Sequence, residues 1–190
     1  MPIQKLLESI RSFLIRRWEP PQRPPYRGLA SVGRVALHYH WDRESRAFAE
    51  ALEKELQASG REVLHLAYWP VKRKRQPPPP GPAAEQGYAR GEWNWLWWPR
   101  GLSHWREKAP DVLIDFGRNM PVAAAFYRHT LPVALRVAVG EGGWADVHLP
   151  GNWAQHPFQQ SKRVAQYLNF INNPDNETAT RNGRGIGNAL

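Results

Sequence analysis

Two stretches of this chain share one order of elements: a short apolar strand, a helix and a second strand. In residues 34–69, "RVALHYH" and "REVLHLAYW" have the composition of β-strands, and "DRESRAFAEALEKELQASG" between them has the spacing of an amphipathic helix. Asp42 can cap this helix at its start, and Gly60 suits its end. This order predicts a parallel βαβ unit.

The same order returns in residues 111–139, where "DVLIDF" and "PVALRVAV" flank the helical segment "NMPVAAAFYRH". "WADVHL" at 144–149 predicts a fifth strand, and "HPFQQSKRVAQYLNFINN" at 156–173 predicts a closing helix. The expected fold is therefore a three-layer α/β domain, Rossmann-like or flavodoxin-like, with a mainly parallel five-stranded sheet.

Composition divides the chain around this domain, which we place at residues 29–173. Residues 1–28 combine a basic amphipathic helix with the proline-rich linker "EPPQRPPYRG", whose prolines favour an extended connection. Residues 70–92 interrupt the domain with a basic, proline-rich segment that we expect to be an exposed loop. Residues 174–190 have almost nothing to bury and predict a disordered tail.

Several classes of protein are excluded by what the sequence lacks. It has no cysteine, so disulfides, thiolate metal sites and catalytic thiols are excluded. No apolar run approaches the roughly 20 residues of a membrane-spanning helix. Charged residues interrupt the N-terminal segment, so we expect no cleaved secretory signal and a cytoplasmic location.

The net charge of +9 is unevenly distributed, with +4 in residues 1–28 and +3 in residues 70–92. Clustered cations outside the folded core are typical of proteins that contact phosphate backbones. We therefore predict a non-enzymatic accessory protein that binds an anionic partner, RNA or a ribonucleoprotein. The residues expected to make the contact are Lys72, Arg73, Lys74, Arg75, Arg11, Arg16 and Arg17.

The N-terminal helix leaves other partners open. Its apolar stripe could pack on the domain or on a second copy of the chain, or bind another protein. Its arginines also suit the surface of an anionic membrane. The spacing of its residues does not separate a membrane-surface or protein-partner adaptor from the RNA hypothesis.

A second hypothesis places function where the strands end. In open parallel sheets, ligands bind beyond the carboxyl ends of the strands. There the sequence places Asp42, Asp115, Arg118 and Asn119, which could form a pocket for a small anion or an enzyme active site. The structural alternative is that Asn119 only caps a helix, that Asp115 satisfies local N–H groups and that Arg118 is only solvated.

No motif identifies a cofactor or a metal. The first strand is followed by "HWDRES" rather than a glycine-rich turn, so a dinucleotide or Walker loop is absent there. His38 and His40 share one face of a strand, and His65 on the next strand could lie near them, but we predict no metal site. Because no spacing matches a particular chemistry, the sequence favours a binding protein over an enzyme.

The segment "EWNWLWWPRGLSHW" holds five of the ten tryptophans. Trp93, Trp95 and Trp97 alternate as they would on one face of a strand. They could form a stacking platform for bases, sugars or a partner's prolines. The alternative is that these rings fill the core, as large aromatic side chains usually do.

In the order and residue sequence of these segments, the chain resembles a family of small bacterial α/β proteins. The family is known mainly from the Bacteroidota and carries a domain-of-unknown-function label. The resemblance covers the chain from end to end and is closest in the C-terminal half. It implies the same α/β fold and no activity, and the tryptophan-rich and proline-rich segments depart from it. The matching segments are Trp98 to Gly101, "DVLIDF" at 111–116, "LRVAVG" at 135–140, "ADVHL" at 145–149 and "QYLNFINN" at 166–173.

Overall fold

We describe the protein from a computed structural model. It describes residues 23–28, 31–71, 87–89, 107–118, 120, 127–140 and 144–170, with short pieces at 9–10, 13, 81, 93–94 and 98–99. The domain boundaries predicted from composition, including the tail at 174–190, stay predictions.

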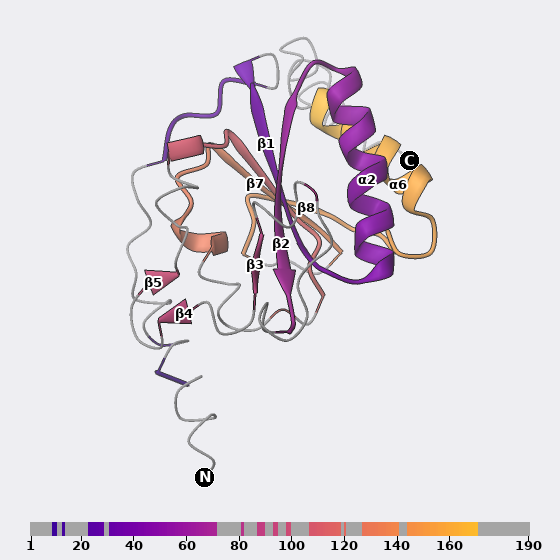
Figure 1. Cartoon of the computed structure of the whole chain (residues 1–190). Helices are drawn as coiled ribbons and strands as arrows, with labels where there is room; N and C mark the ends of the chain where they lie inside the picture. The colour runs from indigo at the N-terminus through magenta and orange to yellow at the C-terminus, as the bar shows by residue number, and fades with distance from the viewer. Residues whose placement is uncertain are drawn as a thin grey trace, which may run out of the picture.

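A parallel sheet forms the centre of the fold (Figure 1). The five predicted strands are present, and the two-residue strand β3 extends one edge, so the order is β3-β2-β1-β6-β7-β8. Every neighbouring pair is parallel. The bounds are β1 Arg34–His40, β2 Glu62–Trp69, β3 Tyr88–Ala89, β6 Val112–Asp115, β7 Leu135–Val139 and β8 Val147–Leu149.

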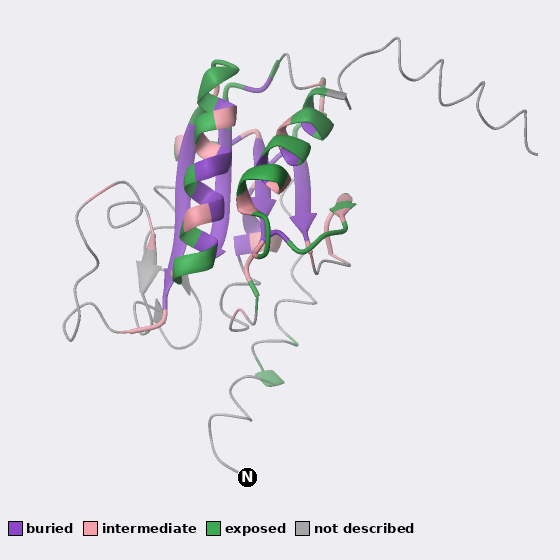
Figure 2. Ribbon diagram, turned by 90° about the vertical axis from the view of Figure 1, so that its right-hand side faces the viewer, coloured by how far each residue is buried: buried purple, intermediate pink, exposed green. Residues whose placement is uncertain are grey.

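Two long helices, α2 (Arg43–Ala58) and α6 (Pro157–Phe170), lie side by side on one face of this sheet (Figure 1). Each turns its buried side toward the strands and its exposed side outward (Figure 2). The start of α2 is as predicted, because the Asp42 carboxylate accepts a hydrogen bond from the Ser45 N–H at 2.8 Å. Its end is also as predicted, with Gly60 in the left-handed region at φ 79°.

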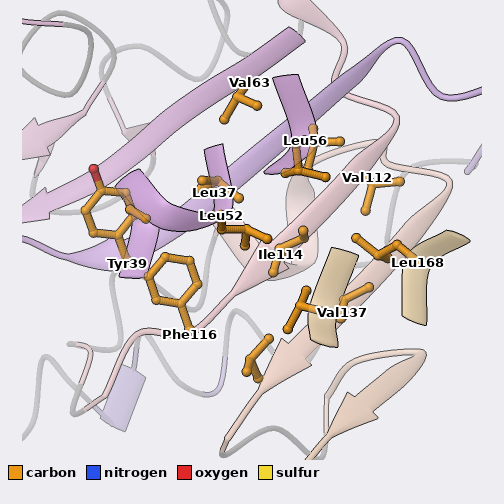
Figure 3. Close-up of a cluster of buried hydrophobic side chains, with 14 of the residues drawn as sticks. Leu37, Tyr39, Leu52, Leu56, Val63, Val112, Ile114, Phe116, Val137 and Leu168 are labelled. Atoms are coloured by element: carbon orange, nitrogen blue, oxygen red, sulfur yellow. The ribbon is translucent and has the colours of Figure 1, made fainter. Parts of the chain in front are cut away.

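Alternate residues of each strand face opposite layers. Val35, Leu37 and Tyr39 of β1 point toward α2 and α6, where side chains from four strands and both helices meet (Figure 3). Ala36 of β1 belongs to a second cluster on the other face, together with Leu131 and Val133. Part of the helix expected at 119–129 is present there, since residues 127–130 are helical. These two clusters confirm the three-layer α/β fold.

The proline-rich linker contacts the domain through Arg23. Its guanidinium donates hydrogen bonds of 2.9 Å to the carbonyls of Val133 and Ala134 and makes a two-pronged ion pair with Asp146. Asp146 also accepts a bond from the backbone N–H of Arg136. These acceptors lie at the amino ends of β7 and β8, so Arg23 joins the linker to that edge of the sheet.

The tryptophan-rich segment contains the short antiparallel strands β4 (Trp93–Asn94) and β5 (Trp98–Pro99). Trp93 therefore lies in a strand, whereas Trp95 and Trp97 lie outside the described residues. Within the described part of the chain, no helix is long and apolar enough to cross a membrane.

The core predicts a sharp contrast between two phenylalanines. We expect Phe48→Ala to lower the free energy of unfolding by about 3–5 kcal/mol, because Phe48 of α2 is fully buried among aromatic rings. Phe158→Ala on α6 is the matched control: Phe158 is 67% exposed, so the loss should stay within about 0.5 kcal/mol. Urea unfolding of both variants checks this, and equal losses would contradict the packing.

Candidate functional site

The strand order gives the sheet a topological switch point at its carboxyl edge, between β1 and β6. The chain runs from β1 outward to β2 and then returns to β6 on the other side of β1. The connections that follow β1 and β6 therefore diverge, and ligands of open α/β sheets bind at such a switch point. The candidate site is built from residues that follow β1, β6 and β8.

Arg118, which follows β6, is held in a defined orientation at this edge. Its guanidinium carbon lies 4.8 Å from the centroid of the Trp153 ring, and Nη2 donates a 2.7 Å hydrogen bond to the Asn152 side chain. Trp153 is buried, whereas Arg118 is exposed. A guanidinium fixed on a buried ring loses little freedom when it binds an anion.

The loop that orients Arg118 leads into α6. Gly151 has φ 153°, and a Cβ at this position would come within 3.2 Å of the Gln160 side chain in the first turn of α6. The first turn contains no acidic residue. The free N–H groups of a helix start favour negative charge, and here no acidic side chain of the first turn opposes them.

Asp42, the second predicted pocket residue, has a structural role. Its two carboxylate oxygens accept bonds from the N–H and the hydroxyl of Ser45, at 2.8 and 2.9 Å. His40 Nδ1 lies 3.3 Å from the same carboxylate but forms no hydrogen bond with it. Asp42 is therefore the cap of α2, as the sequence predicted, and both of its carboxylate oxygens are used in that role.

Asp115, the last residue of β6, forms a buried ionic cluster. Its carboxylate is 2.5 Å from His38 Nδ1 and accepts two bonds from Arg128, at 2.5 and 3.0 Å. It also accepts a 3.0 Å bond from the Gly117 N–H. Burial alone raises the pKa of Asp115, but attraction to His38 and Arg128 outweighs burial and holds the pKa below its usual value.

The predicted pocket is thus partly assembled. Asp115 and Arg118 follow the same strand, but Asp115 is 1% exposed and committed to the cluster, so of these two only Arg118 meets solvent. Asn119 lies outside the described residues. Sequence reasoning missed Asn152, Trp153 and Arg128, because no local pattern connects them to β6.

The suggestion that His65 could approach His38 and His40 is wrong. His65 pairs in register with Leu37, whose side chain points toward α2 and α6, whereas His38 points to the other face. His65 instead contacts Tyr39 Oη at 3.0 Å and Glu53 at 3.4 Å. In the part of the chain that the structure describes, no three potential ligands form a metal site.

The basic residues predicted to bind RNA are Lys72, Arg73, Lys74, Arg75, Arg11, Arg16 and Arg17, and all of them lie outside the described residues. Val71, the described residue that precedes Lys72, follows β2 at the carboxyl edge.

A scan against protein-family models finds no match, and no curated protein matches the sequence. The resemblance in the C-terminal motifs therefore stays a prediction, and the functional argument depends on the geometry of the site.

The ionic cluster predicts a pH-dependent loss of stability. Asp115→Asn leaves His38 and Arg128 without their carboxylate, so we expect a loss of about 3–5 kcal/mol at pH 7. The pKa of Asp115 is lower in the folded state. Its contribution is therefore fully present above the unfolded value, about 3.9, and is lost as the pH falls through the folded value.

Urea unfolding of the native protein and the variant between pH 7 and pH 3 measures this. The two stabilities should converge only below about pH 4. Asp42→Asn is the control, because asparagine caps a helix as well as aspartate does, and its stability should change little. A constant difference between native protein and Asp115→Asn down to pH 3 would contradict a charged Asp115.

Proposed function

We propose that the protein binds a phosphate-bearing partner at the carboxyl edge of its sheet and acts as a binding protein. The observation that supports this most directly is the oriented, exposed guanidinium of Arg118 at the switch point, stacked on Trp153 and bonded to Asn152. Arginine in a fixed orientation is well suited to two-pronged contacts with phosphate oxygens.

The charges around Arg118 favour an anion over a cation. The two nearby carboxylates that the sequence suggested, Asp42 and Asp115, are occupied by the cap of α2 and by the buried cluster. The start of α6 adds N–H groups without an acidic side chain in its first turn. An approaching phosphate group therefore meets positive charge that the protein has not already neutralised.

The same arrangement supports binding rather than catalysis. General acid–base chemistry needs a titratable group within hydrogen-bond reach of the substrate. Asp115 is buried and bonded to His38 and Arg128, and both oxygens of Asp42 are bonded to Ser45. Neither carboxylate is positioned to exchange a proton with a ligand beside Arg118.

RNA is the partner that best combines this site with the rest of the chain. In the sequence, four consecutive cations, Lys72 to Arg75, directly follow Val71, which the structure describes after the end of β2. A single phosphate uses only Arg118, whereas a nucleic-acid strand offers a row of phosphates to Arg118 and to the basic run. A small phosphorylated ligand shares this chemistry, and experiment separates the two.

Removing the guanidinium should weaken binding of either ligand. We expect Arg118→Ala to lower the affinity for a generic single-stranded RNA, and for a nucleoside monophosphate, by about 10- to 100-fold. Titration calorimetry measures both. Arg163→Ala removes the same charge from an exposed position of α6 and should change neither affinity appreciably. Equal effects of the two substitutions would refute a specific role for Arg118.

The salt dependence of binding identifies the larger partner. Changing Lys72, Arg73, Lys74 and Arg75 together to Ala should reduce the slope of log affinity against log salt by about three units for single-stranded RNA. Binding of the nucleoside monophosphate should be unaffected. A control with Lys54, Lys162 and Arg163 changed to Ala, all on α2 or α6, should keep the native slope. If RNA does not bind even at low salt, the RNA proposal is wrong, whatever the small ligand does.

A further inference from the structure

A second group of cations lies away from the proposed site, around the amino end of β7. Arg136, the second residue of β7, is only 6% exposed. Its Nη2 donates hydrogen bonds to the carbonyls of His129 and Leu131, at 2.9 and 3.3 Å, just after the helical turn at 127–130. The guanidinium therefore enters the layer opposite α2 and α6.

The hydrogen bonds of Arg136 are incomplete. Its Nε is buried and has no hydrogen-bond partner. Among the ion pairs of the described residues, none joins Arg136 to a carboxylate. Asp146 is near enough to attract it, but both Asp146 oxygens are bonded to Arg23, and one also accepts the backbone N–H of Arg136. Buried donors without acceptors are rare, and each calls for an explanation.

The charges around Arg136 do not balance. The described ion pairs of this region contain Arg23 with Asp146 and Arg128 with Asp115, which leaves the charge of Arg136 in excess. The pKa of His129 is lowered mainly by burial, and the positive charges of the nearby Arg136 and Arg128 lower it further. Trp144 lies over this group, 5.1 Å from the Arg128 guanidinium carbon and 6.4 Å from the His129 ring centroid.

We propose that Arg136, with Arg128, His129 and Trp144 around it, forms a binding site for a small oxyanion such as phosphate or sulfate. An oxyanion would accept the hydrogen bond that Nε now lacks and supply the missing negative charge. Arg136 lies near the amino end of β7, away from Arg118. Arg128 also bonds Asp115 and the Gly117 carbonyl beneath the carboxyl edge, but the proposed function does not rest on Arg128, so the two proposals stand independently.

A purely structural role for Arg136 makes a different prediction. Carbonyls at the end of a helical turn carry partial negative charge, so Arg136 could serve only as their partner. The loss of such a contact would destabilise the protein equally in every buffer. A binding site, in contrast, adds stability in proportion to the anion that occupies it.

Thermal unfolding at constant ionic strength, with sodium phosphate exchanged for sodium chloride, separates these roles. We expect phosphate at saturating concentration to raise the midpoint of the native protein by about 5 °C. Arg118→Ala should keep at least half of this rise, which would show that phosphate also binds outside the carboxyl edge. Arg136→Met should abolish whatever rise remains in the Arg118→Ala background.

Arg136→Lys provides a second variant if the methionine variant does not fold. Lysine keeps the charge and can reach the carbonyls, but it lacks the Nε donor and the fork of the guanidinium, so the phosphate-dependent rise should still fall at least twofold. An equal loss of midpoint in chloride and in phosphate for either variant would overturn the proposal. So would a native protein whose midpoint does not distinguish phosphate from chloride.

Discussion

The buried carboxylate of Asp115 is the contact on which the middle of this fold depends. It joins three parts of the chain that are far apart in sequence: His38 on β1, the end of β6 and Arg128 on the helical turn at 127–130. A carboxylate that is 1% exposed is tolerable only when cations surround it. These contacts connect the layer opposite α2 and α6 to the central strands β1 and β6. They also keep Asp115 buried, whereas Arg118, three residues later, is exposed.

Periodicity and capping signals predicted most of the fold. The amphipathic stripe of α2, its cap at Asp42 and its end at Gly60 are local patterns, and the structure has all three. The strand predicted at 144–149 is shorter, Val147–Leu149, because Trp144 packs on the second core cluster and Asp146 binds Arg23. These contacts come from distant residues, so alternation along the segment could not reveal them.

The candidate site was predicted less completely, because it depends on register and on loops. His38 and Asp115 meet since β1 and β6 pair in one register, and the same alternation places His65 on the opposite face. Arg118 was predicted from its place after a strand, but its orientation comes from Asn152 and Trp153, which belong to the loop after β8. A strand end can be read from the sequence, whereas the loop that reaches across to it cannot.

Three arginines show why position, rather than charge alone, decides what a cation can bind. Arg128 has its carboxylate partner within the fold, so its charge is already neutralised. Arg118 is exposed and held on Trp153, with a single hydrogen bond to Asn152. Arg136 is buried, and its Nε donor has no hydrogen-bond partner. The net charge of +9 treats these residues as equal, although Arg128 is already paired with Asp115, whereas we propose that Arg118 and Arg136 each bind an anion. An anion at Arg118 arrives from solvent at low desolvation cost and can exchange quickly. An anion at Arg136 must lose its hydration and would act as a part of the folded structure.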